Sequence, residues 1–189
     1  MAHNDINGVP CHSNKWLMED VLRKEYGFDG FIVSDWMDIE RLYTRQFTAT
    51  SRKEAFYQSI MAGMDMHMHG IYWNEEVAEL VREGRIPMSR IDESVRRILT
   101  AKFRLGLFEN PYCNIEEGKK VRMCEEHRAT ALEAARNSIV LVKNNGILPL
   151  DIKKYKRVLV TGINADDQNI MGDWSAPQKP ENITTILEG

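Results

Sequence analysis

The sequence lacks the features that mark secreted disulfide-rich, membrane-spanning and nucleic-acid-binding proteins. Only 3 of the 189 residues are cysteine, and these well-separated thiols form neither a disulfide framework nor a zinc-binding pattern. No apolar run approaches the roughly 18 residues that a membrane helix needs. The first residues show no basic segment followed by an apolar one, so no secretory signal is expected. The formal net charge of −3 gives no reason to expect nucleic acid or an anionic membrane as a partner.

Short apolar runs instead alternate with amphipathic stretches. Residues 30–33 and 64–68 read as short strands, and the first of them is apolar throughout. Between them, Ser51 and Glu54 form a capping box at the start of a helix that Gly63 ends. This order of strand and helix is typical of a parallel α/β sheet or barrel. Further helices are predicted at 14–26, 74–84, 89–106 and 124–137, with caps at Asn14 and Ser89.

The alternating pattern breaks at residues 111–122, which contain proline, glycine and five charged residues and are predicted to be a linker. Apolar runs at 139–142 and 158–162 then predict strands of a second α/β domain. We therefore expect domains at 1–110 and 123–189. Two strands before the linker cannot close a barrel, so neither domain is expected to be complete.

Asp35 is the first candidate for chemistry because it lies at the carboxyl end of an apolar strand, where α/β folds place active sites. An acid followed by Trp36 suits a sugar site, with a carboxylate for the anomeric carbon and an aromatic plane for the ring. The alternative is an ordinary turn or helix-capping aspartate. Position alone leaves both interpretations open.

Asp65, His67 and His69 alternate, so on a strand they would point to one side. A His-x-His pair can bind a metal in hydrolases. No further cluster of ligands accompanies it, so we predict a hydrogen-bonding cluster at the strand end and no metal.

Two other motifs predict no function. Residues 162–167 follow a predicted strand but lack the Gly-x-Gly-x-x-Gly spacing and the phosphate-binding lysine of nucleotide sites, so no cofactor is expected. Cys11 and His12 are adjacent in sequence and therefore point apart, and no orienting acid follows them.

Taken together, these segments resemble glycoside hydrolase family 3, the β-glucosidase and β-xylosidase group. The most specific string is Phe-Asp-Gly-Phe-Ile-Val-Ser-Asp-Trp at 28–36. Supporting strings follow in order at 4–10, 14–17, 20–23, 62–66, 96–99, 102–108 and 142–150.

The resemblance implies that Asp35 is the nucleophile of a double displacement with retention of configuration. Trp36 would line the aglycone side, and Trp174 would match a tryptophan of the second domain. Asp173 stands where the family more often has glycine. No cofactor or metal is implied, and the partner would be a small carbohydrate.

The implied architecture is the C-terminal part of a (β/α)8 TIM barrel, then a linker, then the start of an α/β sandwich. Glycone-binding groups are expected before Met1 and the acid/base glutamate after Gly189, so the isolated chain is predicted to be nearly inactive. Family usage favours the periplasm or the outside of the cell. Oligomeric state stays open.

The most favoured substrate is a β-glucoside. Alternatives within the family are β-xylosidase and β-N-acetylglucosaminidase activities. An alternative of another class is a non-catalytic sugar-binding module, in which Trp36 and Trp174 stack on the ligand and Asp35 accepts a hydrogen bond.

Overall fold

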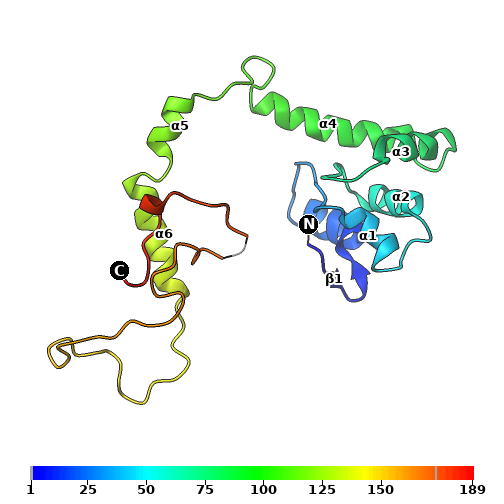
Figure 1. Cartoon of the computed structure of the whole chain (residues 1–189). Helices are drawn as coiled ribbons and strands as arrows, with labels where there is room; N and C mark the ends of the chain where they lie inside the picture. The colour runs from blue at the N-terminus through cyan, green and yellow to red at the C-terminus, as the bar shows by residue number, and fades with distance from the viewer. Residues whose placement is uncertain (1, 173) are drawn as a thin grey trace. The chain divides into compact units, whose positions relative to one another are not determined.

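The computed structural model describes residues 2–172 and 174–189, in two compact units, Met1–Lys119 and Lys120–Gly189 (Figure 1). The division falls in helix α5 (Ile115–Val121), which lies within the segment predicted as a linker. Each unit is described here by itself.

The first unit opens with a β-hairpin that the sequence analysis did not predict. Strands β1 (Asp5–Ile6) and β2 (Val9–Pro10) pair antiparallel, with Asp5 opposite Pro10. Asn7 and Gly8 form the turn with φ values of 54° and 77°, the left-handed backbone that a two-residue hairpin requires. The hairpin leads into the short helix η1 (Cys11–Ser13). It therefore sets the positions of the residues at both of its ends, His3 and His12.

The helices of this unit follow local signals in most cases. Helix η2 (Trp16–Glu25), which has π-type hydrogen bonding, lies where a helix was predicted, and Leu17 N donates to Asn14 Oδ1 at 3.0 Å. Helix α1 (Asp38–Thr44) was not predicted. Helix α2 (Arg52–Ala62) begins at the predicted cap, since Glu54 N donates to Ser51 Oγ at 3.1 Å, while the Glu54 carboxylate accepts from Arg85.

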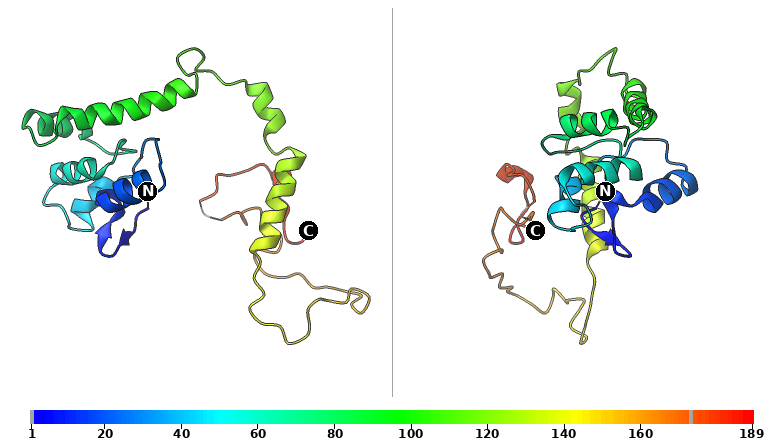
Figure 2. Two further views of the ribbon diagram at one scale, coloured as in Figure 1. Left: turned by 180° about the vertical axis from the view of Figure 1, so that it is seen from behind. Right: turned by 90° about the vertical axis from the view of Figure 1, so that its right-hand side faces the viewer.

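Helices α3 (Trp73–Arg82) and α4 (Met88–Arg104) complete the unit. The predicted cap at Ser89 is wrong, because α4 begins one residue earlier, after Pro87. Pro87 is the N-cap residue, with an extended backbone (φ −69°, ψ 142°) and no side-chain cap bond. Figure 2 shows η2, α1, α2 and α3 close together, whereas the long α4 extends beyond them. The fully buried side chains there include Met18, Ile39, Leu42, Phe56, Met64 and Leu80.

The two predicted strands of this unit meet over a single parallel bridge, between Val33 and Met66. Ser34 N donates to Met66 O at 2.9 Å, and Met66 N donates to Ile32 O at 3.0 Å. The parallel pairing agrees with the prediction, but the ladder is much shorter than predicted.

The second unit contains the end of α5, helix α6 (Glu125–Ser138) and the short η3 (Pro180–Asn182). The strands predicted at 139–142 and 158–162 are absent from the described residues, so that prediction is wrong for this chain. Val142 is 91% exposed and Leu159 84%. Parallel strands are stable when both faces and both edges are covered, and nothing in the described part of the chain covers these runs.

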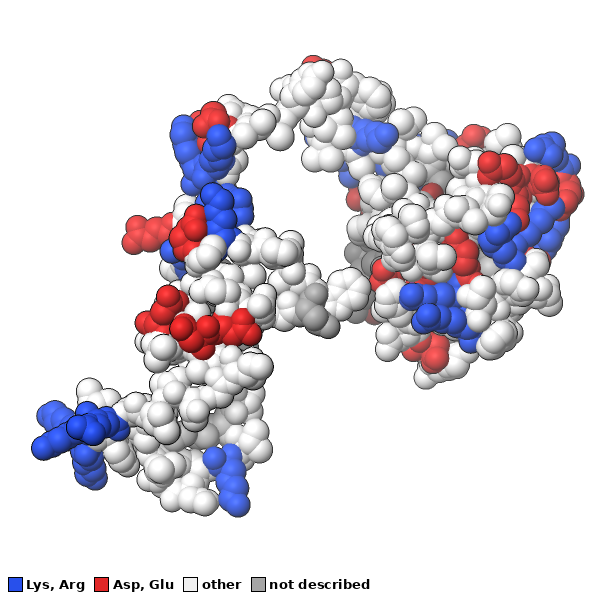
Figure 3. Space-filling model, in the orientation of Figure 1, with Lys and Arg blue, Asp and Glu red and all other residues white. Residues whose placement is uncertain are grey.

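Charges of both signs lie side by side on the face of the first unit shown in Figure 3. Lys53 of α2 contacts Glu79 and Glu83, at 2.9 and 2.6 Å, and so joins α2 to α3. Such exposed pairs contribute about 0–1 kcal/mol each. Among the described residues, no helix is both long and apolar enough to cross a membrane.

Candidate active site

Asp35 follows the parallel bridge directly and precedes the turn into α1, as predicted for a strand end. Its side chain is 34% exposed, so the carboxylate is open to solvent. The preceding Ser34 is fully buried, and its hydroxyl accepts from Met68 N at 2.9 Å and donates to Asp35 O at 3.0 Å. The main chain on both sides of the bridge is thereby held by one serine.

The turn after Asp35 depends on Met37, whose φ of 54° is left-handed. Trp36 N donates to Asp35 Oδ1 at 2.6 Å, and this bond holds the pKa of Asp35 below its usual range. His3 Nε2 lies 3.4 Å from Asp35 Oδ2. Asp35 does not cap α1 through its side chain, since no side-chain cap bond is present at that helix start. The carboxylate is therefore ionised at neutral pH, with Oδ1 bound by Trp36 N and Oδ2 facing His3.

A buried polar cluster that the sequence analysis missed contacts the main chain of Asp35. Asp35 N donates to His12 Nε2 at 3.0 Å, and His12 Nδ1 lies 3.4 Å from Asp38 Oδ2. Asp38 also lies 2.5 Å from His3 Nδ1 and 2.5 Å from Arg41 Nη1. No sequence period links positions 3 and 12 with 35 and 38, because the hairpin and η1 bring them together through tertiary structure.

His3, Asp35 and Asp38 offer three ligand atoms within 4.8 Å of one another. His3 contacts both Asp35 and Asp38, and Asp38 also contacts Arg41. We therefore interpret the three residues as a hydrogen-bonded cluster and assign no metal to it.

Trp36 is 54% exposed beside the carboxylate. Its indole stacks on the imidazole of His69, with ring centroids 3.7 Å apart and planes inclined by 12°. One face of the indole is covered in this way, which fixes the plane of the ring. An aromatic surface next to an ionised carboxylate is an arrangement that can receive a sugar and its leaving group.

Asp65, His67 and His69 do not form the predicted common cluster. His67 contacts Glu40 at 3.1 Å and stacks on Trp73, whereas His69 stacks on Trp36. The expectation assumed a regular strand, in which alternate side chains share a face, but this segment has a single bridge. The three side chains accordingly have separate partners.

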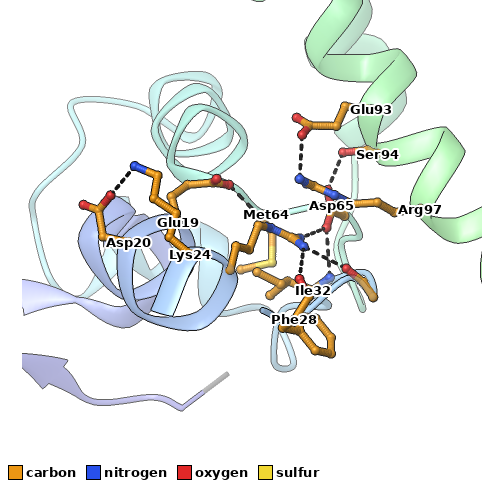
Figure 4. A network of polar contacts seen from close by, with 12 residues as sticks. Glu19, Asp20, Lys24, Phe28, Ile32, Met64, Asp65, Glu93, Ser94 and Arg97 are labelled. Carbon is orange, nitrogen blue, oxygen red and sulfur yellow. Dashed lines mark hydrogen bonds and ion pairs between the residues drawn. The ribbon is translucent and has the colours of Figure 1, made fainter. Parts of the chain in front are cut away.

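Asp65 has the most hydrogen-bond donors of the three (Figure 4). Its side chain is completely buried, and Oδ2 accepts from Ile32 N at 3.0 Å and Arg23 Nη2 at 2.7 Å. Burial by itself raises the pKa of Asp65, but the hydrogen bonds lower it by more, so the net pKa lies below the ordinary value. Asp65 thus anchors the segment that leads to Asp35. The donors to Oδ1 come from α4: Arg90, Ser94 and Arg97.

Trp174 lies in the second unit and is 98% exposed. Trp36 belongs to the first unit, and the role of Trp174 beside it stays a prediction. Asp173, where glycine is commoner, lies outside the described residues.

Family models match both parts of the chain. Residues 1–101 match the glycosyl hydrolase family 3 N terminal domain, and residues 139–189 match the C-terminal domain of the same family.

Individual relatives agree with the family match. A β-xylosidase of Formosa agariphila is 39% identical over 203 residues, covering 100% of this chain and 28% of that protein. A periplasmic β-glucosidase of Salmonella typhimurium is 37% identical, covering 100% of this chain and 25% of that protein. The solved structure of a β-glucosidase involved in saponin metabolism from intestinal bacteria is 40% identical with a TM-score of 0.77, covering 92% of this chain and 23% of that one.

The chain thus spans 28% or less of the length of these three relatives. The helix-rich α/β structure, the carboxylate at the end of the bridged segment and the match over both parts of the chain agree. The chain belongs to glycosyl hydrolase family 3.

Proposed function

We propose that this chain is part of a longer retaining, exo-acting β-glycosidase in which Asp35 is the nucleophile. The observation that carries the proposal is the state of Asp35, an exposed and ionised carboxylate at the carboxyl end of a parallel-bridged segment, next to a half-exposed tryptophan. A nucleophilic carboxylate has to be ionised at working pH, and the Trp36 N–H keeps it so.

In the proposed reaction, a carboxylate oxygen of Asp35 attacks the anomeric carbon while the bond to the leaving oxygen breaks. That oxygen takes a proton from a general acid, and a water molecule later cleaves the glycosyl ester with the acid acting as base. Oδ1 accepts from Trp36 N at 2.6 Å, whereas Oδ2 has a longer contact of 3.4 Å with His3 Nε2, so we propose Oδ2 as the attacking oxygen. Retention requires the second carboxyl about 5–5.5 Å away, and we propose that it lies outside this chain.

The proposed architecture follows from the same family. The first unit would supply the C-terminal units of a (β/α)8 barrel, and the second unit the start of an α/β sandwich, joined through residues 111–122. The exposed apolar runs of the second unit support this proposal, because a completed sheet would cover them.

The proposed substrate is a small β-glucoside or oligosaccharide, and the second candidate is a β-xyloside. Both names occur among the relatives, with a β-xylosidase and a β-glucosidase each aligned along the whole chain. A periplasmic or extracellular location is proposed on the name of the Salmonella relative.

Mechanism-based labelling tests the role of Asp35. The longer polypeptide would be incubated with a 2-fluoro β-glucoside, and in parallel with a 2-fluoro β-xyloside, and its peptides analysed by mass spectrometry. We expect the sugar on the peptide that contains Asp35, with the faster label identifying the glycone. Asp35→Asn should block labelling, whereas Asp29→Asn, an exposed aspartate on the same unit, should not. A label on another carboxylate would refute the assignment.

We propose that the 189-residue chain alone is nearly inactive, because the general acid, a group worth about 10²–10⁴-fold in rate, is proposed to lie outside it. Purified chain should release no burst of nitrophenol from an aryl β-glucoside. Saturable sugar binding by the longer polypeptide without any label or hydrolysis would favour the non-catalytic module instead.

A further inference from the structure

The main chain of Asp35 makes a hydrogen bond that determines the protonation of a histidine. Asp35 N–H is a donor, and His12 Nε2 lies 3.0 Å from it, so Nε2 has to present a lone pair. In a neutral imidazole the proton is then on Nδ1. That nitrogen faces Asp38 Oδ2 at 3.4 Å, and a carboxylate can only accept.

Burial favours the same state of His12. His12 and Asp38 are each only 2% exposed. Burial lowers the pKa of His12 to about 4, against the opposing effect of Asp38. Among the described residues, Asp38, Asp35 and His3 act on the charge of His12, and Arg41 of α1 contacts Asp38. The imidazole is therefore neutral across the range in which most enzymes work.

We propose that His12, held in its Nδ1–H tautomer by Asp38, is a positioning residue for Asp35. This inference rests on the proposed role of Asp35 as nucleophile. His12 accepts from the main-chain N–H of Asp35, so it sets where the carboxylate stands and takes no part in bond making. Two further hydrogen bonds hold Asp35. Trp36 N–H donates to Oδ1 of its side chain, and the Ser34 hydroxyl donates to its main-chain carbonyl.

Two substitutions at His12 separate positioning from simple packing. Gln places an oxygen near the site of Nε2 and can still accept from Asp35 N–H, whereas Leu cannot. In the longer polypeptide we expect His12→Leu to lower kcat on the order of 10²-fold with KM nearly unchanged, since a shift of about 1 Å at a reacting group costs that much. His12→Gln should stay close to wild type. Equal loss in both variants would overturn the inference.

The pH profile gives a second readout. Protonation of His12 would place an N–H against Asp35 N–H and break the bond. The acid limb of kcat/KM in the wild type should therefore report two ionisations, those of Asp35 and His12. In His12→Gln it should report one. A purely structural histidine would leave the number of ionisations unchanged, and that result would also overturn the inference.

The tautomer can be read without any activity. Nitrogen-15 NMR of the histidine side chains in the 189-residue chain, assigned with His12→Gln, should show a protonated Nδ1 and an unprotonated Nε2 at pH 7. A protonated Nε2 contradicts the inference directly. Labelling with the 2-fluoro glycoside distinguishes the two proposals. If the wild type is never labelled on Asp35, the proposed function is refuted. If the His12→Leu variant is labelled at the wild-type rate, only the role of His12 is refuted.

Discussion

His69 lies flat against Trp36, with the two ring centroids 3.7 Å apart. The two residues follow the two bridged segments, Trp36 after Val33 and His69 after Met66. The stack therefore ties together the two loops that leave the carboxyl ends of these segments. It also leaves the other face of the indole free, beside Asp35.

Removing the stacking partner should weaken the proposed aglycone surface. We expect His69→Ala to raise KM for an aryl β-glucoside about 2- to 10-fold with kcat largely kept, because an aromatic pair contributes about 0.5–1.5 kcal/mol. His69→Phe, which restores a ring, should recover most of the loss. Steady-state kinetics of the longer polypeptide on aryl and alkyl glycosides measures this, and equal effects on both substrates would contradict it.

Asp65 should be essential for the stability of the first unit. Asp65→Asn leaves three arginines around a neutral group, and breaking a buried ion pair on one side costs about 3–5 kcal/mol. Urea unfolding followed by circular dichroism measures this cost. The matched control is Asp29→Asn, which loses an exposed pair with Arg104 and should cost less than about 1 kcal/mol.

The contribution of Asp65 should also depend on pH. Its folded pKa is lowered, so the unfolded chain binds the proton more tightly. The stabilisation is fully present above the unfolded pKa of about 3.9 and is lost as the pH falls from there through the folded pKa. The difference in unfolding free energy between wild type and Asp65→Asn should therefore shrink below about pH 4. A constant difference from pH 7 to pH 3 would show that Asp65 is not paired as described.

The start of α2 offers a smaller and local test. Ser51→Ala removes the acceptor for Glu54 N and should destabilise the first unit by about 1 kcal/mol. Ser51→Asp keeps an acceptor at the same place and should cost little. The same urea titration reports both variants, and an Ala variant as stable as wild type would rule out the cap as a stabilising contact.

The left-handed Met37 should respond to glycine. An L-residue in this conformation costs about 1–2 kcal/mol, and glycine adopts it freely. Met37 is 42% exposed, so little packing is lost with its side chain. We expect Met37→Gly to raise the unfolding free energy by about 1 kcal/mol and Met37→Ala not to raise it. If both variants raised the unfolding free energy, the gain would come from removing the methionine side chain and not from relieving the left-handed backbone.

Local signals in the sequence predicted much of the first unit. The pair Ser51 and Glu54 predicted the start of α2, and the end of the apolar run at Val33 placed Asp35 at the edge of the bridged segment. The cap at Ser89 was wrong, since Ser89 lies inside α4 and Pro87 is its N-cap residue.

The surroundings of Asp35 could not be predicted in the same way. His12 reaches it through the β1–β2 hairpin and η1, and this is a relation of tertiary structure with no period in the sequence. Asp65 was grouped with His67 on an assumed strand alternation, but its partners lie on η2 and α4. The strand at 139–142 was predicted from composition, and composition does not supply neighbouring strands.

The carboxylate of Asp65 also limits how far the first unit can be shortened. Its donors come from residue 23 on one side and from residues 90–97 on the other. A fragment that ended before α4 would keep the buried carboxylate of Asp65 but would lose its hydrogen bonds from two arginines and a serine. A truncated form that keeps every donor to Asp65 therefore has to extend from η2 through Arg97, and truncation series should be planned around that limit.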